Sequence, residues 1–308
     1  MTAARRPVSV RGRYRSTREE GDSTREQKLG HVAVMVREVV RALAPARGEV
    51  LVDTTYGQGG HTKVFKAAGA KVISLDADPA SGADAVANFG DLQKVLRKLG
   101  IKKVDKILFD LGWNRGQLAS LRGFSFMHDE PLDMSYGPEP RSGFTAAEIL
   151  NTWSEKALAD ALFGYGEERY ARRIAAAVVA RRKETPFKTT IELVELVRDS
   201  VPPAYRHGRI NPATRTFQAL RIAVNDELGV LESGLTQAWK LLEPCGRVVV
   251  ITFHSIEDRM VKRLFKKFSA GGGGELLYKK PLVPTDVEVR HNPSSRSAKL
   301  RAIQKPCD

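Results

Sequence analysis

A glycine-rich loop from Asp53 to His61, with the sequence Asp-Thr-Thr-Tyr-Gly-Gln-Gly-Gly-His, has the residue types of a ligand-binding turn. Glycines let a ligand approach the main chain, and the N-terminus of a following helix offers unpaired N–H groups. Asp76 stands nineteen residues after Gly57, about the distance at which an acid reaches ribose hydroxyls in dinucleotide-type folds. The order Gly-x-Gly-Gly-His differs from that of pyrophosphate sites, which favours a cofactor with ribose and adenine but no phosphate. In many similar turns, however, the glycines serve packing alone.

Short apolar segments that end in acids must position this loop. Three of the expected strands run directly into Asp53, Asp76 and Asp110, and helical spacing of apolar residues separates them. Strands that alternate with helices imply a parallel, doubly wound sheet, so the predicted fold is α/β and Rossmann-like. The strands are expected at 50–52, 72–75, 107–109 and 247–253, and the helices at 31–43, 62–68, 92–99, 213–242 and 256–268.

The alternation stops between Trp113 and about Ile210, where only helical patterns are found. We therefore expect an all-helical domain inserted into the sheet domain, and a hairpin of 276–278 with 300–303 to close the sheet. The expected domains are a basic arm at 1–30, a discontinuous sheet domain at 31–113 and 211–308, and the helical insert at 114–210. Within the insert, helices are expected at 145–163, 166–183 and 189–200.

The charge balance is strongly basic, with 50 Lys and Arg against 36 Asp and Glu and a net charge of +14. Such an excess favours a polyanionic partner such as nucleic acid, although a solubilising surface is the alternative. Six arginines precede the first acid, Glu19, which is typical of a targeting segment or a flexible nucleic-acid-binding arm. No stretch approaches the roughly 20 apolar residues of a membrane helix.

Cysteine content predicts neither a disulfide framework nor a cysteine-based zinc site, because only Cys245 and Cys307 are present. A reducing compartment follows from this interpretation. No set of residues has metal-ligand spacing, so no catalytic metal is expected.

Longer motifs make the chain similar to a known family. The motifs are 53–61, 110–112 with Gln117, 122–126, 131–134, 214–228, 253–259, 292–293 and 296–301. Together they resemble the small-subunit ribosomal RNA cytosine-N4 methyltransferases of bacteria and mitochondria, over roughly residues 31 to 303. The resemblance implies S-adenosylmethionine-dependent methylation of the exocyclic amine of one cytidine in the decoding region, during maturation of the small subunit. It also implies a methyltransferase sheet with an inserted helical domain.

The resemblance carries cofactor contacts to seven positions, all occupied as the family pattern expects. The residues themselves support Asp76 as the ribose partner and Phe89 as an apolar partner for adenine. The seven are Gly59, Gly60, His61, Asp76, Phe89, Asp110 and Gln117.

The segment between Asp76 and Phe89 departs from the family, because its twelve residues are about half the usual length. A parallel crossover with a helix needs at least about 10–12 residues before the next strand begins. Residues 81–88 are therefore predicted to be too few for the usual helix plus strand, leaving the pocket open on its adenine side or the sheet without one element. This favours an alternative, a weakened or inactive assembly factor that binds the small ribosomal subunit. A methyltransferase of another nucleic acid or of a protein is a third hypothesis.

For the chemistry, an oxygen that accepts an N4–H bond would localise the amine lone pair and help to remove a proton. Asp110 and Asn114 are placed for this, although Asp110 is otherwise a turn cap. His254 is expected at the rim of the active site, since it follows a strand end on the ligand side. For Ser255, Glu257 and Asp258 a helix cap and a substrate contact are both open.

Basic residues in the motifs are candidates for RNA phosphate contacts, and some are instead expected to be salt-bridge partners, Arg221 in particular. The target base must leave its stack, and Trp113 would stack on it or lie in the core. Partners are the small ribosomal subunit or its assembly intermediate, in the mitochondrial matrix or, alternatively, a bacterial cytoplasm. The phosphate-contact candidates are Arg115, Arg122, Arg215, Arg221, Arg296, Lys299 and Arg301.

Overall fold

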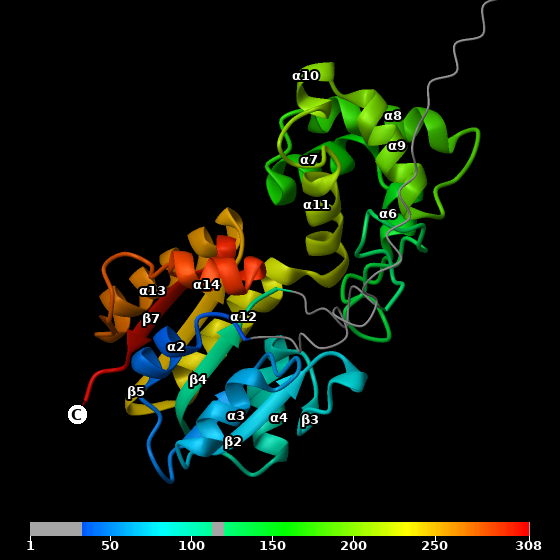
Figure 1. Ribbon diagram of the computed structural model, residues 1–308. Coiled ribbons are helices and arrows are strands. Elements are labelled where there is room, and N and C mark those ends of the chain that lie inside the picture. Colours follow the sequence, from blue (N-terminus) through cyan, green and yellow to red (C-terminus); the bar gives the residue numbers. More distant parts are fainter. Residues whose placement is uncertain (1–32, 113–119, 308) are drawn as a thin grey trace, which may run out of the picture. The chain divides into compact units, whose positions relative to one another are not determined.

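The computed structural model describes residues 33–112 and 120–307 (Figure 1). The expected N-terminal arm and the predictions for Trp113, Asn114, Arg115 and Gln117 lie outside these residues.

A seven-stranded sheet forms the centre of the sheet domain, in the order β3-β2-β1-β4-β5-β7-β6. The first five strands in this order are parallel, whereas β7 is antiparallel to both of its neighbours. The doubly wound α/β fold is thus confirmed, and β6 and β7 pair at its end as expected, with α14 (Asp286–His291) between them in the chain. The strands are β1 (Val50–Asp53), β2 (Lys71–Asp76), β3 (Ala85–Val86), β4 (Val104–Asp110), β5 (Leu242–Thr252), β6 (Glu275–Leu276) and β7 (Lys299–Gln304).

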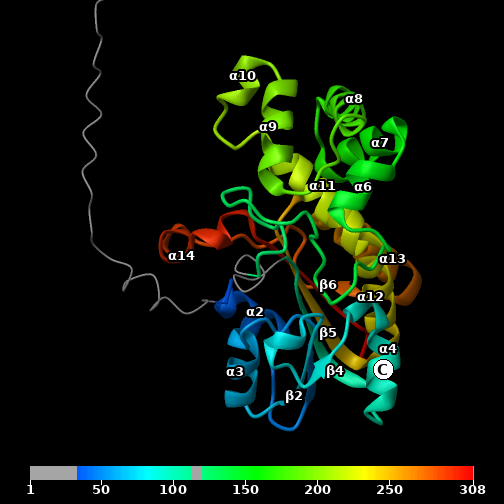
Figure 2. The ribbon, with the colours of Figure 1, turned by 90° about the vertical axis from the view of Figure 1, so that its right-hand side faces the viewer.

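Helices cover both faces of this sheet, as Figure 2 shows. Ile107 and Phe109 of β4 point into the core beneath one helical layer, and Leu108 between them points into the other. This alternation follows from the pleat of a strand, and apolar residues on both faces are typical of a covered parallel sheet. One layer contains α4 (Leu92–Lys98), α12 (Glu227–Leu241) and α13 (Ser255–Gly272); the other contains α2 (Val36–Leu43) and α3 (Gly60–Ala67).

A separate apolar core lies among the helices that follow β4, built from residues between Leu132 and Val224. Local capping explains their boundaries: the expected helix at 145–163 is two helices, because Ser154 caps a new one with its side chain. The expected helix at 213–242 is also two, separated by Asp226 at φ 47°. None of the described helices is long and apolar enough to cross a membrane. The helices are α6 (Ala146–Thr152), α7 (Glu155–Gly166), α8 (Ala171–Arg182), α9 (Thr190–Ser200), α10 (Pro203–Arg206) and α11 (Thr214–Asn225).

The short crossover after Asp76 corrects one expectation. The sheet keeps a strand beyond β2, because β3 pairs in parallel with the end of β2. The helix is replaced by a single 3-10 turn at Pro79–Ser81, as the length of the segment predicted. Asp84 supports the shortened edge: its carboxylate accepts hydrogen bonds from the backbone N–H and the hydroxyl of Ser74, at 2.9 and 2.7 Å.

The two cysteines form a disulfide, so the expectation drawn from cysteine content alone is wrong here. Cys245 and Cys307 are 62 residues apart in the chain, with their Cα atoms 4.5 Å from each other. The cause is the return of β7 alongside β5, which places Arg247 opposite Gln304 and brings the flanking cysteines together.

Candidate active site

The carboxyl ends of the parallel strands bring the predicted acids to one edge of the sheet. Asp53 ends β1, Asp76 ends β2 and Asp110 ends β4. The strand order reverses between β1 and β4, and ligands of open α/β sheets bind at such a switch point. The edge is therefore the candidate active site.

The glycine loop is a tight turn into α3. Gly59 has φ 74°, and a Cβ at this position would lie 2.7 Å from the ring of Tyr56. A Cβ at Gly60 would lie 2.7 Å from that of Ala33. The left-handed φ of Gly59 and close packing at both positions thus account for these glycines without a ligand, and the first turn of α3 presents its N–H groups at this edge.

Threonine hydroxyls join the ends of β1 and β4. The Asp110 N–H donates to the hydroxyl of Thr55 over 2.8 Å, and the hydroxyl of Thr54 donates to the Leu108 carbonyl over 2.8 Å. Thr62, on α3, donates to the carboxylate of Asp53 over 2.7 Å. Burial raises the pKa of Asp53 despite these contacts. No role for these threonines was predicted, although the run Asp-Thr-Thr directly after a strand is a signal in the sequence.

His61 and Asp110 form an ion pair inside this edge. The distance from His61 Nε2 to Asp110 Oδ2 is 3.3 Å, with side chains 5% and 15% exposed, but without hydrogen-bond alignment. Burial would lower the pKa of His61, but Asp110, with smaller contributions from Asp53 and Glu288, raises that pKa above its usual value. Both ring nitrogens of His61 and Oδ1 of Asp110 are buried without a hydrogen-bond partner among the described residues. Buried polar groups normally have a partner, and a bound polar ligand or water can supply it here.

Asp76 and Phe89 lie at the β2 side of the edge. Asp76 accepts hydrogen bonds from the Gly57 N–H (2.7 Å) and the Asp78 N–H (2.9 Å), and burial raises its pKa. The Ala77 N–H also contributes a hydrogen bond, and because an ionised carboxylate has about four acceptor sites, about one remains. Phe89 packs edge-on against Phe109, with ring centroids 5.4 Å apart, and is only partly buried.

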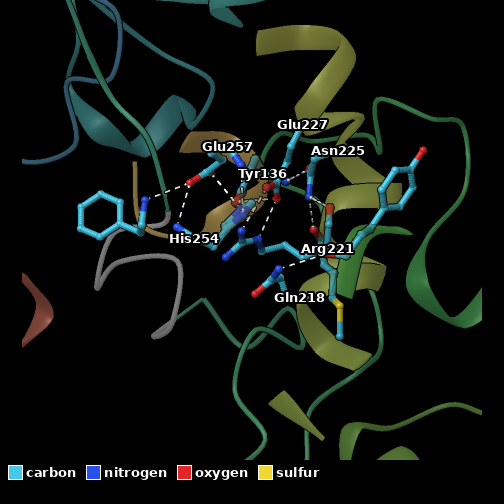
Figure 3. A network of polar contacts seen from close by, with 10 residues as sticks. Tyr136, Gln218, Arg221, Asn225, Glu227, His254 and Glu257 are labelled. Atoms are coloured by element: carbon cyan, nitrogen blue, oxygen red, sulfur yellow. Dashed lines mark hydrogen bonds and ion pairs between the residues drawn. The ribbon is translucent and has the colours of Figure 1, made fainter. Parts of the chain in front are cut away.

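A second polar cluster, drawn in Figure 3, joins the residues after β4 with α11, α12 and the start of α13, the helix that follows β5. Arg221 donates two hydrogen bonds to Glu227, at 2.7 and 3.0 Å, and the Tyr136 hydroxyl donates to the same carboxylate at 2.9 Å. This confirms the salt-bridge alternative for Arg221. Asn225 fixes the loop that carries Tyr136, since its side chain accepts from the Tyr136 N–H and donates to the Met134 carbonyl. The cluster thereby ties the residues after β4 to α11 and α12.

His254 and Glu257 complete the cluster at the start of α13. His254 is the N-cap, its ring accepts from the Glu257 N–H, and the Glu257 carboxylate accepts from the N–H groups of Phe253 and His254. Burial would raise the pKa of Glu257, but His254 and Arg221 lower it. Glu257 is therefore a helix cap. Ser255 donates to Glu167 instead, over 2.7 Å.

Candidate metal-ligand atoms of Glu227, His254 and Glu257 lie within 4.8 Å of one another. Both Glu227 oxygens are occupied by Arg221, and His254 Nε2 is 3.1 Å from Glu257. A guanidinium group in this position repels a cation, so the arrangement is that of a self-paired network.

The candidate phosphate contacts are scattered over several environments. Arg301 makes two hydrogen bonds to Asp258, which also lies 3.5 Å from Lys299. Arg122 donates to the Gly137 carbonyl and Arg215 to that of Glu167. Arg296 is exposed.

Comparison with known proteins decides the family. The sequence profile of the MraW methylase family matches residues 28–306. The chain belongs to the MraW methylase family. It is therefore a methyltransferase, and its cofactor is S-adenosylmethionine.

Relatives named "Ribosomal RNA small subunit methyltransferase H" are similar over most of the chain. The protein of Geotalea daltonii is 42% identical, over 89% of this chain and 98% of its own length. That of Deinococcus deserti is 43% identical, over 92% and 96%, and that of Hyphomonas neptunium is 45% identical, over 89% and 88%.

The edge fits this cofactor. Asp76 keeps acceptor capacity for a ribose hydroxyl, Phe89 offers apolar surface, and Asp110 Oδ1 is an acceptor without a partner among the described residues. When bound, S-adenosylmethionine supplies an electrophilic methyl group.

Proposed function

We propose that the chain methylates the exocyclic N4 amine of a cytidine in small-subunit ribosomal RNA. The observation that carries the proposal is Asp110 at the switch point of the sheet, with one carboxylate oxygen unpartnered within the described residues and the other beside His61. The names of relatives 42–45% identical to this chain support the choice of RNA.

In the proposed reaction the cytosine N4 forms a bond to the methyl carbon while the bond from that carbon to sulfur breaks. The amine lone pair is delocalised into the ring, so an acceptor for an N4–H bond increases its nucleophilicity. Asp110 Oδ1 takes this role and Asn114 assists it. The proton that N4 loses goes to water, directly or through Asp110. Positioning of the two reactants supplies most of the remaining rate enhancement.

The other residues surround this centre in the same proposal. Gly59, Gly60, His61 and Asp76 hold the cofactor with Phe89 and Gln117, and His254 borders the substrate. The phosphate contacts that best fit their surroundings are Arg122, Arg215 and Arg296, because Arg221 and Arg301 are engaged with acids.

The assembly-factor alternative loses its main structural argument. It rested on the short segment after Asp76, but β3 is present and supported by Asp84.

Calorimetry with S-adenosylmethionine tests the cofactor site. We expect binding to the wild-type chain and to Asp160→Ala, an exposed acid of α7, and loss of binding in Asp76→Ala. Transfer of labelled methyl groups to small-subunit ribosomal RNA, followed by nucleoside mass spectrometry, tests the reaction. Label in any nucleoside other than N4-methylcytidine, or none at all with the cofactor bound, would overturn the proposal.

Partner and location are part of the proposal. We infer that the substrate is the small subunit or its assembly intermediate, and that the basic N-terminal residues direct the chain to the mitochondrial matrix, with a bacterial cytoplasm as the alternative. Fractionation of cells that express the tagged full-length chain tests the location.

A further inference from the structure

The solvent face of α13 carries basic side chains that the active site does not use. The helix packs on the sheet through the apolar residues Val261, Leu264, Phe265 and Phe268. Its exposed face holds four cations in two successive pairs, which we call the α13 ridge. They are Lys262, Arg263, Lys266 and Lys267.

Nothing in the described part of the chain neutralises this ridge, since none of its four side chains lies within ion-pair distance of a carboxylate there. The acids of α13 itself are engaged elsewhere: Glu257 caps the helix, and Asp258 is paired with Arg301. The neighbouring Arg259 is paired with Glu167. The ridge is therefore a concentrated positive surface whose four cations have no ion-pair partner in residues 33–112 and 120–307.

The spacing of the ridge costs the helix stability. Lys262 with Lys266, and Arg263 with Lys267, are neighbours at i and i+4, and like charges at this spacing repel. An external polyanion relieves that repulsion. Along α13 the ridge is about 8 Å long, from a rise of about 1.5 Å per residue.

The position of α13 connects the ridge with the reaction. The helix starts directly after β5, at the carboxyl edge that holds Asp110, and runs back along the sheet beside β7 (Figures 1 and 2). A polyanion that enters the active site can continue over this helix.

We propose that the α13 ridge binds the phosphate backbone of the RNA substrate outside the active site, without recognising its sequence. This inference rests on the proposed function, because it takes RNA as the polyanion. Lys and Arg contacts to phosphates fix the register of a nucleic acid and carry no sequence information directly. The aromatic side chains of α13, Phe265 and Phe268, are buried against the sheet, which agrees with backbone contacts rather than base stacking on this helix.

The test compares two variants with the same loss of charge. One is Lys262→Ala/Arg263→Ala/Lys266→Ala/Lys267→Ala. The control is Lys94→Ala/Arg97→Ala/Lys98→Ala/Lys102→Ala, which removes exposed cations on and after α4, the helix that leads into β4. Filter binding to small-subunit ribosomal RNA and to an unrelated RNA of equal length is measured over a series of KCl concentrations.

We expect the ridge variant to bind both RNAs on the order of tenfold more weakly or worse, with a salt slope shallower by about 3. The control keeps the wild-type slope, and both variants keep the wild-type Kd for S-adenosylmethionine, which shows that they are folded. Equal slopes for the two variants would overturn the inference. So would unchanged binding to free RNA with weaker binding to the whole subunit, which would indicate a protein partner.

Failure of the proposed function has a different signature. In that case the wild-type chain transfers no methyl group to small-subunit ribosomal RNA. The difference in salt slope between ridge and control variants still decides whether the ridge binds RNA phosphates.

Discussion

His61 Nε2 lies 3.3 Å from Asp110 Oδ2, which joins the glycine loop after β1 to the end of β4. The contact matters because Asp110 is the proposed acceptor for the N4 amine. It leaves one carboxylate oxygen beside an imidazole and the other without a partner among the described residues. In the proposed site, the glycine loop that we assign to the cofactor thereby also fixes the carboxylate that we assign to the substrate amine.

Replacing His61 by glutamine is expected to remove a pH dependence of stability. The folded-state pKa of His61 is raised above 6.5, mainly by Asp110 against the opposing effect of burial. The charged pair therefore stabilises the fold fully below about pH 6.5, and this contribution disappears as the pH rises through the raised pKa. Urea denaturation from about pH 5 to about pH 9 measures the effect. His128→Gln, at an exposed histidine, is the control, and parallel curves for wild type and His61→Gln would contradict the prediction.

Gly59→Ala is expected to destabilise the chain and to weaken cofactor binding. Alanine at φ 74° is strained, and its Cβ would also clash with the ring of Tyr56. Gly82→Ala is the matched control, because Gly82 has φ 78° but open space around a Cβ. Backbone strain alone costs about 1 kcal/mol or more, so the excess loss in Gly59→Ala measures the clash. Calorimetry should show weaker binding of S-adenosylmethionine for Gly59→Ala only, and equal effects of the two changes would argue against the packed turn.

The strand ends were predictable because the signal is local. An apolar run followed by an acid predicts a buried strand with a carboxylate at its end, and this holds at Asp53, Asp76 and Asp110. The breaks at Ser154 and Asp226 were missed, although a serine cap is also a local signal, since the apolar periodicity continues across both positions.

The contacts between distant residues were not predictable in the same way. The pairing of Tyr136 with Glu227, and that of Cys245 with Cys307, depend on which elements lie side by side in the folded chain. The sequence offered the residue types but not the register of β7 against β5. The crossover after Asp76 shows what segment length can predict. Its length correctly predicted that the usual helix is missing. A strand of two residues needs so little chain that the length could not exclude it.

Arg221→Met is expected to be strongly destabilising. Arg221 and Glu227 are each only 11% exposed, so the variant leaves a buried carboxylate without its cation. Breaking one partner of a buried ion pair costs about 3–5 kcal/mol, whereas removing both charges costs much less. Arg221→Met/Glu227→Gln should therefore recover a large part of the loss in free energy of unfolding, measured by urea denaturation. A double variant no more stable than Arg221→Met would show that the pair does not act as a unit.

Glu167→Ala is expected to affect RNA methylation more than stability. Glu167 ends α7, and its carboxylate accepts hydrogen bonds from Ser255 and Arg259 at the start of α13, both at 2.7 Å. With the Glu167 and Arg259 side chains 42% and 60% exposed, such a pair contributes at most about 1 kcal/mol. It nevertheless connects the helices after β4 with the helix that follows His254. We therefore expect a higher KM for RNA, an unchanged Kd for S-adenosylmethionine and a nearly unchanged free energy of unfolding.

Exchanging the charges of Glu167 and Arg259 tests whether their contact orients the two helices or whether only the loss of charge matters. Glu167→Arg should raise the KM for RNA further than Glu167→Ala, because it places two cations together at the start of α13. Adding Arg259→Glu restores an opposite-charge pair and should return the KM toward the wild-type value. Lys156→Glu/Asp160→Lys, which swaps an exposed pair within α7, controls for the change of surface charge. If the swapped Glu167 and Arg259 variant keeps the high KM of Glu167→Arg, the contact does not align the two parts of the site, and Glu167 serves only to end α7.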